Sequence, residues 1–381
     1  MDNSTYAKGL EGVVAAESNI CQIDGEKGRL YYMGYSVNDL AEHCSFEEVT
    51  YLLLYGELPS SEKFDDFTKK MRSGRTLVQP IRDMIKSFPQ KSHPMELMQS
   101  VIAYLSGHVE HRIHHSATCN CRTTLHQVSQ LPSVIAAYWR FKEGKDYVAP
   151  REDLSHGANF LYMLNGVEPD PVEGDIMDKC FILHAEHGFN ASTFASRVVA
   201  STMSTCYCSI ASAIGALYGT LHGGANEKVI AMLDEIGDRE KVRAWVESAL
   251  QRKQKIMGMG HRVYKAKDPR AIIMTEFAEK LSEKHGDSRY LEMLNEIELV
   301  FREKMEQKGK PIYPNVDFLS GAVYRLLNIQ PILFTPLFAA ARAAGWLAHI
   351  LEQRVDNRLY RPRALYVGRE PRAFVALDNR N

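Results

Sequence analysis

The chain has 381 residues, of which 45% are hydrophobic, so it is long enough to bury the core of one or two globular domains. This composition excludes a disordered tail protein or a disulfide-stapled peptide. The 46 basic and 47 acidic side chains leave a formal net charge of −1, so no global field attracts nucleic acid or anionic lipid. We therefore expect no nucleic-acid or membrane partner, and we expect any anion to be bound by local arginines.

The sequence carries no feature of a membrane or secreted protein. Its longest apolar stretches, such as 331–341, are shorter than the ~20 residues that span a bilayer, and the polar residues 2–5 do not resemble a signal peptide. The seven cysteines are odd in number and scattered, which favours reduced thiols over a disulfide framework. We therefore expect a soluble, cytoplasmic protein.

Most segments repeat their apolar residues at helical spacing, which predicts an all-α fold. The one strand-like region comes first: two short alternating runs within 20–35 flank a polar turn at 24–28 and predict a small β-hairpin. Helices are then predicted, in chain order, over 45–55, 61–73, 95–105, 128–141, 175–187, 204–218, 226–236, 268–286 and 335–352. Charged stretches with glycine and proline at 142–155 and 304–313 predict linkers.

The segment 221–227 reads Leu-His-Gly-Gly-Ala-Asn-Glu and places His222 before two glycines, where a helical pattern begins. The glycines would let the backbone approach a ligand closely, and the positive end of the next helix would lower the pKa of the imidazole. His222 would then be a neutral hydrogen-bond donor at neutral pH. A loop histidine without a role fits the motif equally well.

A second glycine-rich segment surrounds His261. Residues 258–265 read Gly-Met-Gly-His-Arg-Val-Tyr-Lys, and Lys265 and Arg270 add cationic groups that could bind an anion. The glycine spacing is that of neither a P-loop nor a dinucleotide fingerprint, and no strand precedes it. We therefore exclude both of those nucleotide-binding motifs.

Three further charged residues stand in unusual settings. Asp317 lies among apolar and amide residues and could be a general base with a raised pKa, although taken alone the cap of the following helix is favoured. Arg342 is the only charge between 331 and 347, so a buried guanidinium there needs a carboxylate from the fold or from a substrate. Arg361, near the C-terminus, would by itself be assigned to a solvated tail.

Two groups of residues could hold a metal. His184 and His187 are three apart on a predicted helix, but the motif is not the HExxH of zinc hydrolases. The second group consists of His108, His111, His114, His115, Cys119, Cys121 and His126. Its spacing matches no standard zinc module, so a polar loop is favoured and we predict no metal site.

In this order, the motifs resemble the citrate synthase family, specifically its short bacterial and archaeal members and the related 2-methylcitrate synthases. The resemblance covers nearly the whole chain, through GLEGVVAAESNICQIDGEKGRLYYMGY, EVTYLLLYGELP, HPMELM, EDLSHGANFLYML, ILHAEHGFNASTF, LHGGANE, GMGHRVYKAKDPRA, YPNVDFLSG and RPRALYVG. It implies a helical two-domain fold, with a small domain over 220–324 and a large domain made of 1–219 and 325–381. It also implies an obligate homodimer whose active sites are completed across the interface.

The resemblance implies that the chain condenses acetyl-CoA with oxaloacetate and water to give citrate and CoA, the entry to the tricarboxylic acid cycle, without a cofactor. Asp317 would remove a proton from the acetyl methyl group, His222 would hydrogen-bond the thioester oxygen, and His261 would polarise the ketone of oxaloacetate. The oxaloacetate carboxylates would be bound by His187, Arg270, Arg342 and Arg361 of the partner subunit.

Coenzyme A would contact the loop 256–260, formed by Ile256, Met257, Gly258, Met259 and Gly260, with Lys265 near a phosphate. The chain departs from the family pattern in three places. Met257 and Met259 are unusual in that loop, Glu186 stands where many members have aspartate, and the histidine- and cysteine-rich stretch 108–126 is not a family feature.

Three alternatives stay open at this point. A 2-methylcitrate synthase would use propionyl-CoA, and one added methylene changes selectivity by only ~1–3 kcal/mol, so the sequence does not separate the two activities. A metal-dependent hydrolase would bind stoichiometric zinc through one of the two histidine groups. A catalytically silent CoA-binding protein would keep the fold without turning over.

Overall fold

The structure, a computed structural model, describes residues 6–108, 122–309 and 312–380. Within these residues the chain forms sixteen α-helices and one three-stranded antiparallel sheet, which confirms the predicted all-α class with a small N-terminal hairpin. The strands are β1 (Cys21–Asp24), β2 (Arg29–Tyr32) and β3 (Tyr35–Ser36). The helices are α1 (Val37–His43), α2 (Phe46–Tyr55), α3 (Ser61–Ser73), α4 (Gln79–Ser87), α5 (Pro94–Leu105), α6 (Arg122–Lys142), α7 (His156–Asn165), α8 (Pro171–Ala185), α9 (Ala191–Ser201), α10 (Cys206–Tyr218), α11 (Ala225–Ile236), α12 (Arg239–Gln251), α13 (Pro269–His285), α14 (Arg289–Glu306), α15 (Val316–Leu326) and α16 (Phe334–Val355).

The nine predicted helices are present, but several predicted boundaries are wrong: α6 starts at Arg122 rather than at 128, for example, and α8 starts at Pro171 rather than at 175. Helix α8 ends at Ala185 rather than at 187, because the backbone becomes extended at Glu186, whose carboxylate accepts a hydrogen bond from the Gly188 N–H at 2.5 Å. His187 therefore lies beyond the helix, and the predicted i, i+3 pair with His184 does not exist. Helix α14 continues to Glu306, so the second linker starts later than 304, because Met305 packs into the core.

Apolar spacing did not predict α1, α4, α7, α9, α12 and α14. These helices are short or rich in polar residues, and tertiary contacts hold them: α9, for example, packs along α10 and α16. Helix α9 buries serine, threonine and arginine side chains on its inner face. A face of that composition carries no apolar period to detect.

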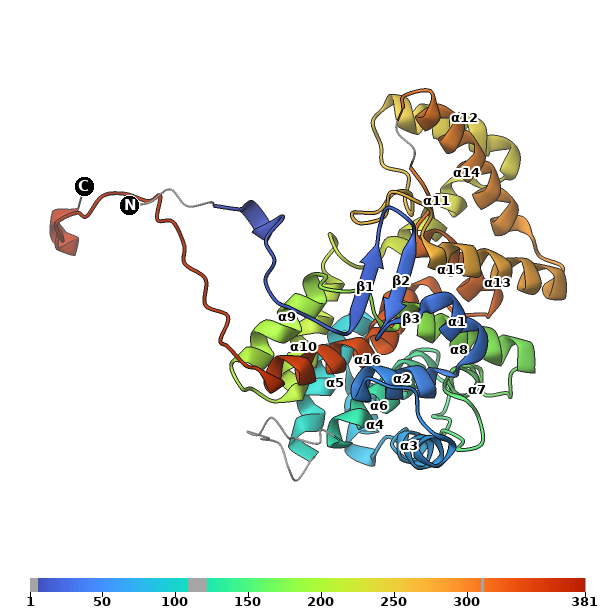
Figure 1. Ribbon diagram of the computed structural model, residues 1–381, viewed down its shortest axis with the longest axis horizontal. Helices are drawn as coiled ribbons and strands as arrows, with labels where there is room; N and C mark the ends of the chain where they lie inside the picture. The colour runs from blue at the N-terminus through green and yellow to red at the C-terminus, as the bar shows by residue number, and fades with distance from the viewer. Residues whose placement is uncertain (1–5, 109–121, 310–311, 381) are drawn as a thin grey trace.

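Helix α16 is the centre of the larger group of helices and contacts α2, α6, α8, α9 and α10 (Figure 1). In the described part of the chain, Pro331–Val355 is the one helical stretch that is long and apolar enough to cross a membrane, and 83% of its most apolar window is buried inside the protein. Such burial is typical of the core helix of a globular fold. The length and composition of α16 therefore carry no argument for a membrane.

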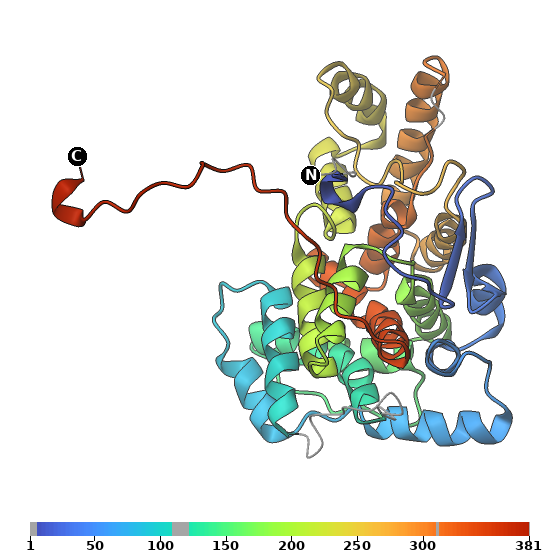
Figure 2. The same cartoon turned by 60° about the vertical axis from the view of Figure 1, so that its left-hand side comes forward.

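Helices α11 to α15 form a second group, drawn in yellow and orange above the rest in Figure 1. They pack mainly against one another, and they meet the larger group where α13 contacts α1 and α8 and where α11 contacts α16. Figure 2 shows the same separation from another side. The loop 219–224, which joins the two groups, carries His222, whereas His187 and His261 lie in loops within the larger and the second group.

The two ends of the chain leave the helical body. The exposed residues 356–380 run outward as an extended segment, which Figures 1 and 2 show pointing away from the helices. The start of this segment touches the N-terminal segment, since the Tyr360 hydroxyl donates a hydrogen bond to the Ala15 carbonyl at 3.4 Å. Apolar side chains along the tail, such as Tyr366 and Val367, are more than three-quarters exposed.

Candidate active site

A cavity of about 650 Å³ lies at the junction of the two helix groups. Six residues that the sequence singled out line it together: His187, His222, His261, Arg270, Asp317 and Arg342. They come from the loop after α8, the loops before α11 and α13, the first turns of α13 and α15, and the middle of α16. Residues up to 155 positions apart in the chain thus share one wall.

His222 is held by the loop between α10 and α11. Gly223 is needed there because a Cβ at that position would lie 2.1 Å from the Leu217 carbonyl oxygen. The imidazole Nε2 accepts the backbone N–H of Ser192 at 3.2 Å and lies 2.8 Å from its hydroxyl. Because an N–H can only donate, Nε2 carries a lone pair, and the proton of the neutral ring is on Nδ1.

His261 has the opposite tautomer. Its Nδ1 accepts the backbone N–H groups of Val263 at 3.0 Å and Tyr264 at 3.2 Å, so the ring proton is on Nε2. Burial, followed by the nearby Arg270, lowers the pKa of His261 to about 4. Burial, Arg342 and Arg262 likewise lower the pKa of His222 to about 4. Both rings are therefore neutral donors at pH 7.

The pKa of His222 is lowered, as the sequence predicts, and burial, Arg342 and Arg262 contribute to this lowering. Gly224 separates the ring from the helix, because Gly224 itself is the N-cap, in the left-handed conformation with φ 75°. The ring points instead toward Ser192, across the loop.

Asp317 lies in the first turn of α15 and is not the helix cap. Asn315 occupies the cap position, and its side-chain oxygen accepts the Asp317 N–H at 2.9 Å. The Asp317 carboxylate is thereby left free to face the cavity. Burial raises the pKa of Asp317 to about 6, against the lowering effect of Arg270 and Arg342.

Two backbone connections bring Asp317 and His261 to the same wall. The Gly260 N–H donates to the Tyr313 carbonyl at 2.8 Å, and the Asn315 N–H donates to the Gly258 carbonyl at 2.9 Å. The Asn315 side-chain amide also donates to the Gly260 carbonyl at 2.8 Å. The loop before α13 and the start of α15 therefore form one unit.

The two cavity arginines are each 2% exposed but are held differently. Arg270 forms a bidentate ion pair with Asp268, with Nε–Oδ1 at 3.0 Å and Nη2–Oδ2 at 2.8 Å, so its Nη1 end is left for a ligand. Arg342 donates through Nε to the His184 carbonyl at 2.7 Å and lies over the Phe338 ring. Among the described residues, no carboxylate lies within ion-pair distance of Arg342, and this favours a substrate carboxylate as its partner.

Comparisons with known proteins agree with this geometry. The family model for the citrate synthase C-terminal domain matches residues 9–363. The citrate synthase of Synechocystis sp. is 46% identical over 379 residues, covering 100% of this chain and 95% of that protein. The chain belongs to the citrate synthase family.

Other members of the citrate synthase family are similar over their whole length. The 2-methylcitrate synthase of Shewanella oneidensis is 38% identical and covers 98% of this chain and 97% of its own. The crystal structure of citrate synthase from Pyrobaculum aerophilum has a TM-score of 0.92 at 40% identity, covering 98% and 95% of the two chains. The Thermoplasma acidophilum citrate synthase, solved as a ternary complex with carboxymethyl coenzyme A and oxaloacetate, has a TM-score of 0.91 at 33% identity, covering 99% and 100%.

His187 lies between the two helix groups. Its Nε2 is 3.2 Å from the Tyr264 hydroxyl, and its ring packs against His261 with centroids 5.1 Å apart. Burial lowers the pKa of His187 well below its usual value, and Arg270 adds to this effect. His187 is therefore a neutral polar group on the cavity wall.

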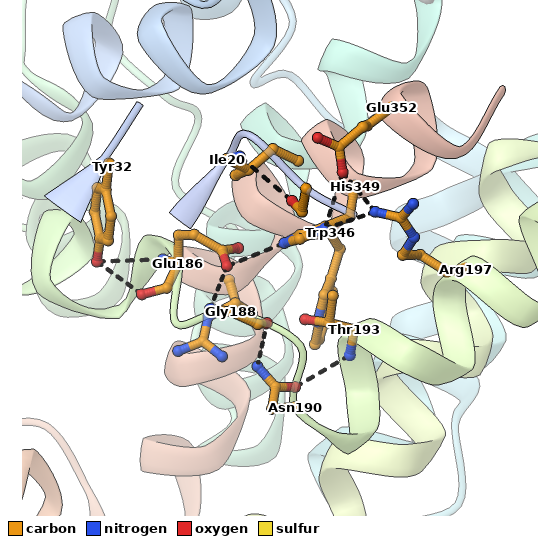
Figure 3. Close-up of polar contacts among 12 residues, drawn as sticks. Ile20, Tyr32, Glu186, Gly188, Asn190, Thr193, Arg197, Trp346, His349 and Glu352 are labelled. Atoms are coloured by element: carbon orange, nitrogen blue, oxygen red, sulfur yellow. Dashed lines mark hydrogen bonds and ion pairs between the residues drawn. The ribbon is translucent and has the colours of Figure 1, made fainter. Parts of the chain in front are cut away.

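A buried network behind the cavity holds the loop that carries His187 (Figure 3). The Glu186 carboxylate accepts from the Gly188 N–H and from His349 Nε2 at 3.1 Å. Arg197 donates to His349 Nδ1 at 3.2 Å, which leaves the His349 proton on the side of Glu186. Both of these hydrogen bonds go to Oε1 of Glu186, the residue that departs from the common family aspartate, and its Oε2 is buried without a hydrogen-bond partner.

Several predicted ligand contacts are not on the cavity wall. Of the loop 256–260, only Gly260 lines the cavity; Ile256, Met257 and Met259 pack against the core, and Gly258 lies against Phe318. Lys265 is exposed and paired with Glu26. Arg361 lies in the exposed tail and is not among the residues that line the cavity. The CoA contacts and the role of Arg361 stay predictions.

Within the part of the chain that the structure describes, neither of the two histidine groups forms a metal site. His184 donates through Nδ1 to the Cys180 carbonyl at 2.8 Å and packs on Phe338, whereas His187 faces Tyr264. In the second group, the residues from 111 to 121 lie outside the described residues. Among the described residues, no three histidine, cysteine, aspartate or glutamate side chains are grouped so that they could hold a metal.

Sequence reasoning missed three residues that shape the site: Ser192, Trp346 and Tyr264. The Trp346 indole N–H donates to the Ser192 hydroxyl at 3.2 Å, and Ser192 in turn contacts His222. The sequence did contain a signal near Ser192. Asn-Ala-Ser-Thr at 190–193 is a helix-capping pattern that begins three residues after His187, and Asn190 is the N-cap of α9. Nothing in the local sequence pointed to Trp346.

Proposed function

We propose that this protein is a citrate synthase, which condenses acetyl-CoA with oxaloacetate and hydrolyses the product thioester to citrate and CoA. One observation carries the proposal: two neutral imidazoles with opposite tautomers and one carboxylate with a raised pKa face a cavity that also holds two buried guanidinium groups. This arrangement provides a base, two hydrogen-bond donors and two anion-binding groups around one reacting centre.

The first step forms an enol or enolate. An Asp317 oxygen takes a proton from the methyl carbon of acetyl-CoA while the Nδ1–H of His222 donates to the thioester oxygen, where the negative charge develops. A thioester methyl group is a weak acid, so the base is effective only when that charge meets a preorganised donor. A pKa of about 6 keeps Asp317 ionised at pH 7 and more basic than an ordinary aspartate.

The second step forms the carbon–carbon bond. The nucleophilic carbon attacks the ketone carbon of oxaloacetate while the Nε2–H of His261 donates a hydrogen bond to the ketone oxygen, where negative charge develops; that oxygen becomes a hydroxyl group as Asp317 gives up the proton that it took from the methyl carbon, so Asp317 is ionised again. Water then attacks the thioester carbonyl of the product, the carbon–sulfur bond breaks, and CoA leaves as the thiol. We propose that the segment 220–324 acts as a small domain that closes over the cavity and keeps bulk water out until condensation is complete.

Oxaloacetate binding requires cations for two carboxylates. Two guanidinium groups of the same chain supply positive charge: Arg270 through Nη1, and Arg342 through its Nη1 and Nη2 groups. His187 adds a neutral polar contact. We propose that Arg361 of the partner subunit supplies the third guanidinium, so that the active enzyme is a soluble, cytoplasmic homodimer. The exposed, outward-running tail supports this, since it leaves Arg361 free to reach another subunit. We expect no cofactor besides the two substrates.

The choice of acyl group separates citrate synthase from the alternative, 2-methylcitrate synthase. Propionyl-CoA differs from acetyl-CoA by one methylene, worth only ~1–3 kcal/mol in an apolar pocket. The citrate synthase of Synechocystis sp. is 46% identical to this chain, against 38% for the 2-methylcitrate synthase of Shewanella oneidensis. We therefore favour acetyl-CoA.

The test is a thiol-release assay with oxaloacetate and each acyl-CoA in turn. We expect thiol release only when both substrates are present, with a higher kcat/KM for acetyl-CoA than for propionyl-CoA. A higher kcat/KM for propionyl-CoA would establish the alternative. Tight CoA binding without turnover would contradict both activities and support a silent CoA-binding protein, and activity lost to a chelator would support a metal-dependent hydrolase.

A further inference from the structure

The turn of the β1–β2 hairpin packs directly on the backbone of the loop that carries His261. A Cβ at Gly25 would lie 2.2 Å from the Val263 carbonyl oxygen, and a Cβ at Gly28 would lie 2.6 Å from the Lys267 carbonyl oxygen. The two chain segments are therefore in contact through backbone atoms. In Figure 1 the blue hairpin reaches up to the yellow and orange helices, and Figure 2 shows the same approach.

Gly25 is required by this contact and not by its own conformation. It is absent from the glycines with positive φ, so alanine could adopt its backbone geometry if the loop were not there. A hydrogen bond from the Lys265 N–H to the Gly25 carbonyl, at 2.9 Å, fixes the register of the two segments. The ion pair between Glu26 and Lys265 is exposed and adds little.

The same loop backbone sets the tautomer of His261. The Val263 carbonyl touches Gly25, and the Val263 N–H donates to Nδ1 of His261 at 3.0 Å. The next residue, Tyr264, donates its N–H to the same nitrogen and places its hydroxyl on His187. A shift of Val263 would therefore disturb both imidazoles that face the substrate ketone and carboxylate.

The other end of the hairpin is anchored beside His187. The Tyr32 hydroxyl on β2 donates to the Glu186 carbonyl at 2.8 Å, at the point where α8 ends. On β1, Ile23 lines the cavity, and its Cδ1 is 3.3 Å from where a Cβ of Gly188 would stand. The hairpin thus spans from the His187 loop to the His261 loop.

We propose that the β1–β2 turn is a positioning element for the proposed reaction, and that Gly25 is a positioning residue that sets His261 relative to His187 through the Val263 backbone. This inference rests on the proposed function. It assigns to the N-terminal hairpin a role in oxaloacetate binding and ketone polarisation, although only Ile23 of the hairpin lines the cavity.

The experiment compares Gly25→Ala with a control in the neighbouring β2–β3 turn of the same sheet, Gly34→Ala. Gly34 has a φ of 88° and no atom near its Cβ position, so alanine there strains the hairpin without touching the loop. We expect Gly25→Ala to lower kcat/KM for oxaloacetate by roughly 10- to 100-fold, since displacement of a positioning group by about 1 Å has costs of that order. The KM for acetyl-CoA should change much less, and Gly34→Ala should keep wild-type kinetics.

A second readout does not depend on activity. Hydrogen exchange of the segment 259–267 in the substrate-free protein should become faster in Gly25→Ala, because the Lys265 amide loses its acceptor, and should stay unchanged in Gly34→Ala. If Gly25→Ala does not fold, Tyr32→Phe, which loosens the opposite end of the hairpin, should give a smaller rise in the KM for oxaloacetate.

Unchanged kinetics and exchange in Gly25→Ala, or an equal loss of activity in Gly34→Ala, would overturn the inference while leaving the proposed function intact. Wild-type protein that releases no thiol with either acyl-CoA would instead overturn the proposed function. In that case the exchange measurement still tests the contact between the hairpin and the loop.

Discussion

At the scale of single residues, the protonation state of each site histidine is set by its hydrogen-bond partners and its burial. Backbone N–H groups face Nε2 of His222 and Nδ1 of His261, so the two rings carry their protons on opposite nitrogens. Each ring is buried enough to stay neutral, with its pKa lowered to about 4. Hydrogen-bond partners, rather than the identity of histidine, thus decide which atom is offered to a ligand.

Asp317→Asn should abolish thiol release and also stabilise the fold at neutral pH. The pKa of Asp317 in the folded protein, about 6, is above its ordinary value of 3.8. The protonated carboxyl therefore contributes to the free energy of unfolding below pH 3.8, and this contribution is lost as the pH rises through 6. The asparagine variant removes this cost of about 1–3 kcal/mol above pH 6. Thermal melts at pH 7.5 and thiol-release assays of both proteins test this, and an active or less stable variant would contradict it.

The pH dependence of kcat/KM should show an acid limb set by Asp317. Its carboxyl must lose a proton to act as a base, and this occurs through a pKa of about 6, whereas His222 and His261 stay neutral down to about pH 4. We expect kcat/KM to fall about tenfold per pH unit well below 6. A profile that is flat from pH 5 to 8 would argue against Asp317 as the base.

At the scale of elements, loops between helices hold most of the site residues, and helix-capping side chains fix the positions of these loops. Asn315 caps α15 and also donates to the Gly260 carbonyl, so one side chain holds the loop of His261 against the helix of Asp317. Helix α16 contributes Arg342 from its middle turns, where the neighbouring residues are apolar and buried. A rigid, locally apolar stretch with one charge therefore supplies an anion-binding group in a dry environment.

Asn315→Ala should reduce both stability and activity. The cap is worth about 1 kcal/mol, and loss of the bond to Gly260 should loosen the His261 loop and lower kcat/KM by roughly tenfold or more. Ser155→Ala, which removes the cap of α7 away from the cavity, is the matched control and should lower only the melting temperature. Equal activity losses in the two variants would show that the effect of Asn315 is merely one of stability.

At the scale of the whole molecule, one proposed ligand of oxaloacetate comes from outside the chain. Arg361→Ala and Asp317→Ala should each be inactive as homodimers. When the two variants are mixed and reassociated, half of the dimers are mixed and each has one intact site, so activity should return to about one quarter of the wild type. No recovery would mean that Arg361 does not act across the interface.

The sequence predicted the helical class, the hairpin and six of the residues that line the cavity, because these depend on local period, turn composition and motif order. It missed α9, whose inner face is polar, and it placed His187 on a helix that ends two residues earlier. It also favoured Asp317 as a helix cap, since two neighbouring residues could occupy that position and only the folded turn selects Asn315.

What the sequence alone determined was a set of candidate residues: the histidines beside glycines, the aspartate in an apolar setting and the one charge between 331 and 347, with their roles implied only by the family resemblance. Only the tertiary structure decided which nitrogen of each histidine is protonated, which carboxylate faces the cavity and which of the two cavity arginines lacks a carboxylate partner among the described residues. The reason is that these properties depend on distances of a few ångströms between groups far apart in the chain. Local sequence patterns contain periods and motifs, and they do not contain those distances.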